Sequence, residues 1–248
     1  MPLGLGAGLT KGGIIRSIPG IVTDGLVMKH MYPAGAVQPL NDGAAYFDGS
    51  DLIDYGSGSD LDVAALAFSV SFWFYNLADT SDALVSKGHS QGSGDGWAIS
   101  VTGNEQIYFD IHDASNRDDT HTDNNVAPLN TWTHVCCTRV AGTGARTIYI
   151  NGVSSNSATE TDVTTITDAA INLKVGTCSN NRLLTGYISN FGYWVGTALT
   201  QPQVKSIMFK EYSNLTSTEK TNLKIWNSYS ANANDESGNG NNGTTTGF

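Results

Sequence analysis

The stretch TGYISNFGYWVGTALT, residues 185–200, decides the fold. Its first eleven residues are β-branched, aromatic or small, which is typical of a strand that is covered on both faces. Because side chains alternate along a strand, two faces are expected. One carries Tyr187, Phe191, Tyr193 and Val195, and the other carries Ile188, Asn190, Gly192 and Trp194. A strand that is apolar on both sides belongs in the middle of a layered sheet.

Two short helices are predicted after this strand. In the first, Thr200 is a suitable N-cap and Pro202 is tolerated in the first turn. An apolar stripe follows at Val204, Ile207 and Met208. The second opens with a capping box at 216–219, and the spacing of Leu223 and Trp226 predicts that they share its apolar face. Asp235 then begins a turn-rich segment, in which it stabilises the turn or takes part in a metal site.

Further strands are indicated by alternation and by turn signals. Residues 68–75 alternate, with Phe68, Val70, Phe72 and Phe74 inward and Ser69, Ser71, Trp73 and Tyr75 on the other face. Segments 97–101, 106–112, 131–140, 147–153 and 171–176 are also predicted to be strands. Residues 102–105 have hairpin composition. Asn151 and Gly152 are typical of a type I′ turn.

These segments together resemble laminin-G-like, concanavalin A-like jelly rolls. The match at the organising strand and the first helix consists of Gly186, Ile188, Phe191, Trp194, Ala198, Leu199, Thr200 and Val204. The YFDGS segment at 46–50 resembles an early family strand, and the order is kept across residues 42–205. The resemblance implies an all-β, two-sheet antiparallel jelly-roll sandwich with one or two short helices.

The first 24 residues differ from the rest of the chain. They are too rich in glycine for a helix and lack the alternation of a strand. We expect residues 1–24 to form an extended arm and residues 25–248 to form the jelly-roll domain. A flexible tail is the alternative to an assembly arm, whose docking residues would be Leu3, Leu5, Leu9, Ile14 and Ile15. Such starts followed by a laminin-G-like domain resemble those of tailed-phage virion proteins.

Composition excludes several classes of protein. With 13 basic and 23 acidic residues the formal net charge is −10, which argues against binding to a phosphate backbone. No apolar run has the length of a signal peptide core or a membrane span, so we expect no membrane association. The spacing of Cys136, Cys137 and Cys178 fits neither a zinc site nor a disulfide framework, which predicts three buried free thiols.

Catalytic patterns are missing from the sequence. A retaining glycosidase needs two carboxylates about 5–5.5 Å apart across the sugar. None of the five glutamates, Glu105, Glu160, Glu211, Glu219 and Glu236, lies in a cluster that would supply such a pair. No Gly-x-Ser-x-Gly motif stands between a strand and a helix. We therefore expect a protein that is not an enzyme.

Calcium is the cofactor that the resemblance suggests. Asp48 is the position that carries over as a family-like ligand, with a turn-forming aspartate as the alternative. Asp113, Asp118 and Asp119 lie in the polar segment 112–125 and offer hard oxygen ligands. A solvated loop is the other interpretation of that segment, in which His112 and His121 are weaker metal candidates. The relatives' acidic pair is replaced here around Ser189, Asn190 and Gly192.

Carbohydrate binding is the other activity that the resemblance implies. Lectin sites combine an aromatic platform with polar groups on loops at one edge of a sandwich. Five residues at predicted strand ends have the required chemistry: Trp97, Asn104, Asn180, Asn181 and Arg182. Each aromatic residue can instead belong to the core.

Two functions follow from these observations. The first is a non-enzymatic virion protein, a capsid decoration or fibre component at the particle surface, held to other virion proteins by its arm and assembled as a homo-oligomer. The second is a carbohydrate-binding adhesion module that recognises surface glycans, with or without calcium.

Overall fold

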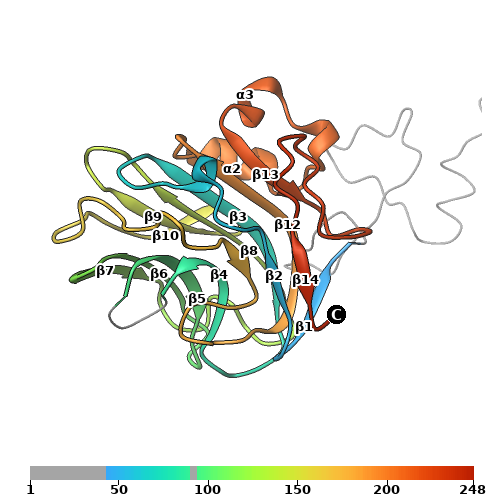
Figure 1. Cartoon of the computed structure of the whole chain (residues 1–248). Coiled ribbons are helices and arrows are strands. Elements are labelled where there is room, and N and C mark those ends of the chain that lie inside the picture. Colours follow the sequence, from blue (N-terminus) through green and yellow to red (C-terminus); the bar gives the residue numbers. More distant parts are fainter. Residues whose placement is uncertain (1–42, 90–93) are drawn as a thin grey trace, which may run out of the picture. The chain divides into compact units, whose positions relative to one another are not determined.

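The computed structural model describes residues 43–89 and 94–248 as two antiparallel sheets facing each other (Figure 1). The first sheet has the order β1 (Ala45–Asp48), β12 (Thr185–Val195), β3 (Phe68–Asn76), β8 (Trp132–Arg139), β9 (Arg146–Ile150) and β10 (Val153–Ala158). β13 (Leu223–Asn227) also pairs with β12. The jelly-roll sandwich expected from the sequence is confirmed.

The second sheet lies on the other side of the core. Its order is β14 (Thr244–Thr246), β2 (Leu52–Asp54), β11 (Lys174–Val175), β4 (Asp82–Gly88), β5 (Gly96–Val101), β6 (Ile107–Asp113) and β7 (Asn116–His121). Short helical segments complete the described chain: η1 (Ser59–Leu61), α2 (Gln201–Ile207), η2 (Tyr212–Asn214) and α3 (Ser217–Lys220). Among the described residues, no helix combines the length and apolar character needed to cross a membrane.

The main core fills the space between the sheets with aromatic rings. Phe68 packs against Trp97 and Phe109 of the second sheet, with ring centroids 5.2 and 5.7 Å away. Tyr193 of β12 reaches Trp97 at 5.7 Å. As predicted, Phe68, Val70, Phe72 and Phe74 of β3 all belong to this core. Burying each ring removes enough apolar surface to contribute about 1.5–3 kcal/mol.

A second apolar cluster lies on the outer face of the first sheet. It joins Trp194 and Cys136 to Val204 and Ile207 of α2 and to Trp226 of β13. The predicted α2 helix is confirmed, since the backbone N–H of Thr200 donates to the Gln203 side chain at 2.9 Å. All three cysteines are buried free thiols, and Cys137 lies in the main core while Cys136 lies in the outer cluster.

The face assignment along β12 is wrong before residue 190. The register with β3 shifts between Ser189 and Gly192, where Asn190 has a φ of 49°. This bulge places two residues of β12 opposite one of β3 and reverses the alternation. Ile188 therefore lies in the core together with Phe191, and Tyr187 lies on the outer face. A strict period of two cannot reveal such an insertion.

Two further expectations need correction. Residues 223–227 form β13 rather than the second turn of a helix, because α3 ends at Lys220 and Leu223 pairs with Trp194. The capping box itself is confirmed. The predicted polar loop 112–125 contains β7, which pairs with β6 across a tight turn. Residues 1–42, which include the predicted arm and the start of the predicted domain, lie outside the described residues.

Turn predictions at two places agree with the structure. Asn151 and Gly152 both have positive φ, 50° and 75°, as a type I′ turn between β9 and β10 requires. The carboxylate of Asp235 accepts hydrogen bonds from the backbone N–H groups of Trp226 and Ser237 at 3.1 and 2.9 Å. Asp235 therefore organises the C-terminal turn.

Replacing Gly192 with alanine should destabilise the fold by about 1–3 kcal/mol. A Cβ atom there would lie 2.6 Å from the Trp194 ring and 3.0 Å from the Trp226 ring. Urea unfolding measures the loss. Gly103→Ala is the matched control, because its nearest atoms, in Asp79, are 3.6 Å away. Equal stability of the two variants would contradict this account of the outer cluster.

Replacing Glu219 with glutamine should make the free energy of unfolding fall less steeply as the pH is lowered. Burial alone would raise the pKa of Glu219, but the Lys210 ammonium and the Thr216 hydrogen bonds outweigh it and lower the pKa from 4.5 to about 2. The carboxylate therefore stabilises the fold fully above pH 4.5, and this contribution is lost as the pH falls towards 2.

Unfolding free energies measured across that pH range test the Glu219 prediction. Glu211→Gln is the control, since it removes an exposed carboxylate whose side chain makes no hydrogen bond within the described part of the chain. An unchanged acid profile in Glu219→Gln would contradict the prediction.

Candidate functional site

The four predicted calcium ligands do not converge in the structure. Asp113 caps the turn before β7 by accepting from the backbone N–H groups of Ser115 and Asn116 at 3.0 and 2.8 Å. Asp118 and Asp119 are adjacent on β7, so their side chains point to opposite faces of the second sheet. Asp48 belongs to β1 of the first sheet. Within residues 43–89 and 94–248, no group of three or more His, Cys, Asp or Glu side chains is arranged to hold a metal ion.

Asp118 has a structural role instead. Its carboxylate accepts from the backbone N–H groups of Thr161, Asp162 and Val163 at 3.0, 3.1 and 2.8 Å and from the Thr161 hydroxyl at 2.7 Å. Burial alone would raise the pKa of Asp118, but these donors outweigh it and lower the pKa. The carboxylate therefore fastens the segment after β10 to β7.

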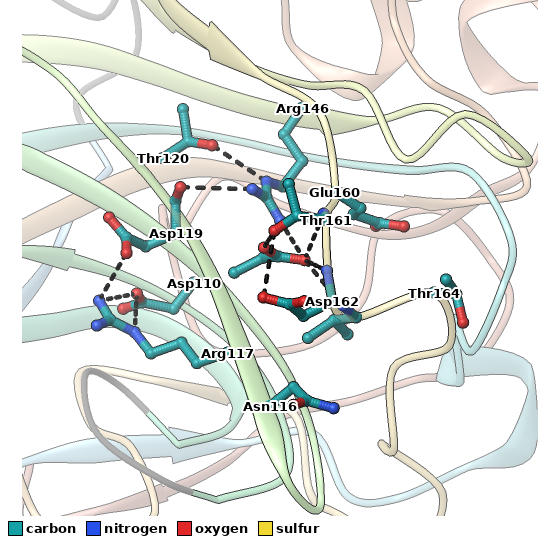
Figure 2. A network of polar contacts seen from close by, with 12 residues as sticks. Asp110, Asn116, Arg117, Asp119, Thr120, Arg146, Glu160, Thr161, Asp162 and Thr164 are labelled. Carbon is teal, nitrogen blue, oxygen red and sulfur yellow. Dashed lines mark hydrogen bonds and ion pairs between the residues drawn. The ribbon is translucent and has the colours of Figure 1, made fainter.

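Polar contacts of two arginines lie on the two faces of β7, and Figure 2 shows Arg146 beside Thr120 and Arg117 beside Asp110. Arg146 is buried, lies 4.0 Å from the Asp118 carboxylate and donates to Thr120 at 3.1 Å. On the opposite face, Arg117 pairs with the buried carboxylate of Asp110 at 2.5 Å. Each buried acid thus has a cationic or N–H partner from its own chain, which leaves this network without the open oxygen ligands that calcium needs.

The two histidines of this region are also separated. His112 is buried, and burial lowers its pKa to about 4, helped by the nearby positive charge of Arg117. His121 is about half exposed, and its ring stacks on Tyr108 at 4.7 Å. They therefore do not form a metal pair.

The predicted carbohydrate residues are not brought together around a ring. Trp97 is fully buried in the core, so its ring cannot serve as a sugar platform. Asn104 is exposed in the turn between β5 and β6. Asn180, Asn181 and Arg182 share the loop between β11 and β12, where Asn180 accepts from the Cys178 thiol. This set offers polar groups without the aromatic face that a sugar needs.

A different aromatic surface is present on the outer face of the first sheet. Tyr46, Tyr187, Tyr75 and Trp132 come from β1, β12, β3 and β8, and each is the register partner of the next. Neighbouring ring centroids are 4.9, 5.9 and 5.3 Å apart. Four rings thus form a row that crosses four adjacent strands. We call it the aromatic row.

The aromatic row is open to solvent. Tyr46 is 46% exposed and the other three rings are partly exposed. Tyr75, Tyr187 and Trp132 line an open hollow of about 570 Å³ with Ala44 and Leu77. Two residues before Tyr75 on the same face, Trp73 is fully buried because Phe209 covers it, with ring centroids 5.5 Å apart. The cover provided by α2 and the residues after it therefore ends where the row begins.

Polar atoms of the row remain available. Within the described part of the chain, the three phenol hydroxyls and the Trp132 N–H make no hydrogen bond to protein. Asp48 lies two residues after Tyr46 on the same face of β1 and is exposed. Hydrogen bonds from the Ser50 hydroxyl and N–H lower the pKa of Asp48, which keeps this acceptor ionised at neutral pH.

A second hollow, of about 470 Å³, is lined by Tyr46. Ala44 lines both hollows. The remaining lining residues are Ala45, Ile53, Tyr229, Ser230, Ala231, Asn232, Ala233, Asn234, Gly243, Thr245 and Phe248. Side chains with hydroxyl and amide groups thus continue the surface beyond the edge strand β1.

Sequence patterns do not reveal the aromatic row, because its members are far apart along the chain. Alternation predicts only that Tyr75 lies on the outer face, opposite the core phenylalanines. The bulge at Asn190 concealed that Tyr187 shares this face. The adjacency of β1, β12, β3 and β8, with this register, comes from tertiary pairing, which no local pattern reveals.

Comparisons with known proteins agree with the fold. A family model described as the concanavalin A-like lectin/glucanases superfamily matches residues 47–205. A search of curated protein sequences found no match. The "putative carbohydrate binding protein" from Bacteroides ovatus is similar in structure, with a TM-score of 0.59 and 16% identity over 85% of this chain and 60% of that one.

Two other solved structures share the fold at low identity. The heptameric SAP-like pentraxin from Limulus polyphemus has a TM-score of 0.51 and 16% identity over 66% of this chain and 81% of its own. The binding domain of Paraclostridial Mosquitocidal Protein 1 has a TM-score of 0.50 and 16% identity over 67% and 47%. This chain therefore spans less than two thirds of the Bacteroides and toxin structures.

Replacing Glu160 with alanine should cost about 3–5 kcal/mol of stability, because it leaves a buried guanidinium without its carboxylate. Arg139 is 1% exposed and donates to both oxygens of Glu160, one at 2.9 Å. Asp119→Ala, which removes a partly exposed carboxylate 3.7 Å from Arg117, is the control and should cost no more than about 1 kcal/mol. Chemical denaturation compares the two, and similar losses would contradict the structural role given to Glu160.

Proposed function

Since the chain belongs to the concanavalin A-like lectin/glucanases superfamily, we propose that it is a non-catalytic carbohydrate-binding protein whose site is the aromatic row. The row is the main support for this proposal, because it is a solvent-exposed surface across four adjacent strands and does not belong to the hydrophobic core. Ligand sites of this kind combine an apolar face with a few placed polar groups.

The chemistry of the row suits sugars. One face of a pyranose ring carries mainly C–H groups, which pack on the electron-rich face of an aromatic ring. The hydroxyls at the ring edge then need hydrogen-bond partners. Tyr75, Tyr187 and Trp132 line the first hollow, and Tyr46 continues the row beside Tyr187. Their phenol groups and the indole N–H can supply these partners, as can the Asp48 carboxylate, two residues after Tyr46 on the same face of β1. The "putative carbohydrate binding protein" of similar fold adds support.

Glutamate roles support a binding rather than a hydrolytic function. Glu160 pairs with Arg139, Glu219 with Lys210, and Glu105 accepts from the backbone N–H of Leu129. A glycosidase acid or nucleophile must face the sugar, whereas these carboxylates hold the fold together.

Attachment to a virion stays a prediction from the sequence. The residues proposed to dock there, Leu3, Leu5, Leu9, Ile14 and Ile15, lie outside the described residues. A particle-bound carbohydrate-binding protein would reconcile both expectations, and the aromatic row can be tested without reference to the arm.

A glycan array with the full chain and two variants tests the proposed function. Trp132→Ala and Tyr75→Ala each remove a central ring, and loss of such a contact should weaken glycan binding at least about tenfold. Tyr108→Ala is the matched control, because Tyr108 is a partly exposed tyrosine on β6 of the other sheet. Glycan binding that both row variants retain at full strength would refute the proposal.

A further inference from the structure

The ligand class follows from the length and the charge of the surface. Resting on the proposed function, we infer that the site takes a linear, uncharged oligosaccharide that lies across the strands along the aromatic row and continues over β1 into the second hollow.

Length is the first argument. Adjacent strands are about 4.8 Å apart, so a row that crosses four strands is about 14 Å long. A pyranose ring is similar in width to a phenol ring, and a single sugar would therefore cover only part of the row. The register partners form one line from Trp132 to Tyr46 rather than a closed cage. Such a line suits consecutive sugars of one chain.

Continuity beyond β1 is the second argument. Ala44 borders both hollows, and the ring of Tyr46, which lines the second hollow, lies 4.9 Å from the ring of Tyr187, which lines the first. An oligosaccharide that packs on these two rings can therefore extend into the second hollow. There the lining changes from rings to small residues and to polar groups such as Asn234 and Thr245. Within residues 43–89 and 94–248, neither of these side chains has a hydrogen-bond partner. Both side chains can therefore form hydrogen bonds with the hydroxyls of a sugar unit that does not pack on an aromatic ring.

Charge is the third argument. Among the described residues, no charged side chain lines either hollow. The charged group on this face of β1 is the Asp48 carboxylate, which is ionised at neutral pH. A uronic acid or a sialic acid would meet a like charge and would find no cation in either lining, which disfavours its binding. A neutral sugar instead gains an acceptor for its hydroxyls.

Titration calorimetry with the full chain tests this inference. The probes are cello-, xylo- and malto-oligosaccharides, from mono- to hexasaccharides, and oligogalacturonates of the same lengths. Affinity for at least one neutral series should rise with chain length, and the acidic series should bind at least about tenfold more weakly.

The variant Asn234→Ala tests whether one end of the bound oligosaccharide lies in the second hollow. This variant should weaken binding of the longest bound oligosaccharide severalfold and leave the shorter ones unchanged, since only a long chain reaches the second hollow. Asn214→Ala, at an exposed asparagine of η2 that lines neither hollow, is the matched control and should bind every length like the unmodified protein.

Failure of the inference can be distinguished from failure of the proposed function. A monosaccharide that binds as tightly as its hexasaccharide, a preference for the acidic series, or an Asn234→Ala variant that binds every length normally would overturn the inference while the row still binds sugar. If none of the neutral or acidic probes binds, and Trp132→Ala instead lowers the mass measured by light scattering, the row joins copies of the chain and both proposals fail.

Discussion

The bulge at Asn190 in β12 is the constraint on which the two faces of the first sheet depend. Before it, Ile188 points into the sandwich and Tyr187 points out. After it, Phe191 and Tyr193 enter the core and Trp194 joins the outer cluster. A strand with strict alternation would place Tyr187 and Phe191 on one face, so the core would hold a phenol and the aromatic row would lose a central ring.

The outer face of the first sheet has one half that other segments cover and one half that is exposed. On one half, the helical segment after β12 packs Val204 and Ile207 against Trp194, and Phe209 covers Trp73. On the other half, the aromatic row has no cover from the described residues. Aromatic rings left in water contribute little to folding stability, since the favourable term comes from apolar surface removed from water. An ordered row of four is better explained by binding.

Charged residues of this protein serve its architecture. The acidic segment that suggests calcium in the sequence supplies Asp118, whose oxygens are occupied by backbone N–H groups, and Asp110, which pairs with Arg117. Buried charges of this kind are retained only when they are fully paired, because an isolated charge in a low-dielectric interior is very costly. The two hollows that share Ala44 have no charged side chain among their described lining residues, and they are the regions that such pairing leaves open.

The sequence by itself determined the fold class, the strands with clean alternation and the caps of the helices, because these depend on residues within a few positions of each other. The inward set of β3, the Asn151–Gly152 turn and the capping box at Thr216 follow from such local rules. The burial of Asp118 and Trp97 does not follow from local rules, because it depends on segments distant in the chain. Only the tertiary structure decided which side chains meet: strand register brings Tyr46, Tyr187, Tyr75 and Trp132 together from four separate segments, and a single extra residue in β12 sets the face on which Tyr187 lies.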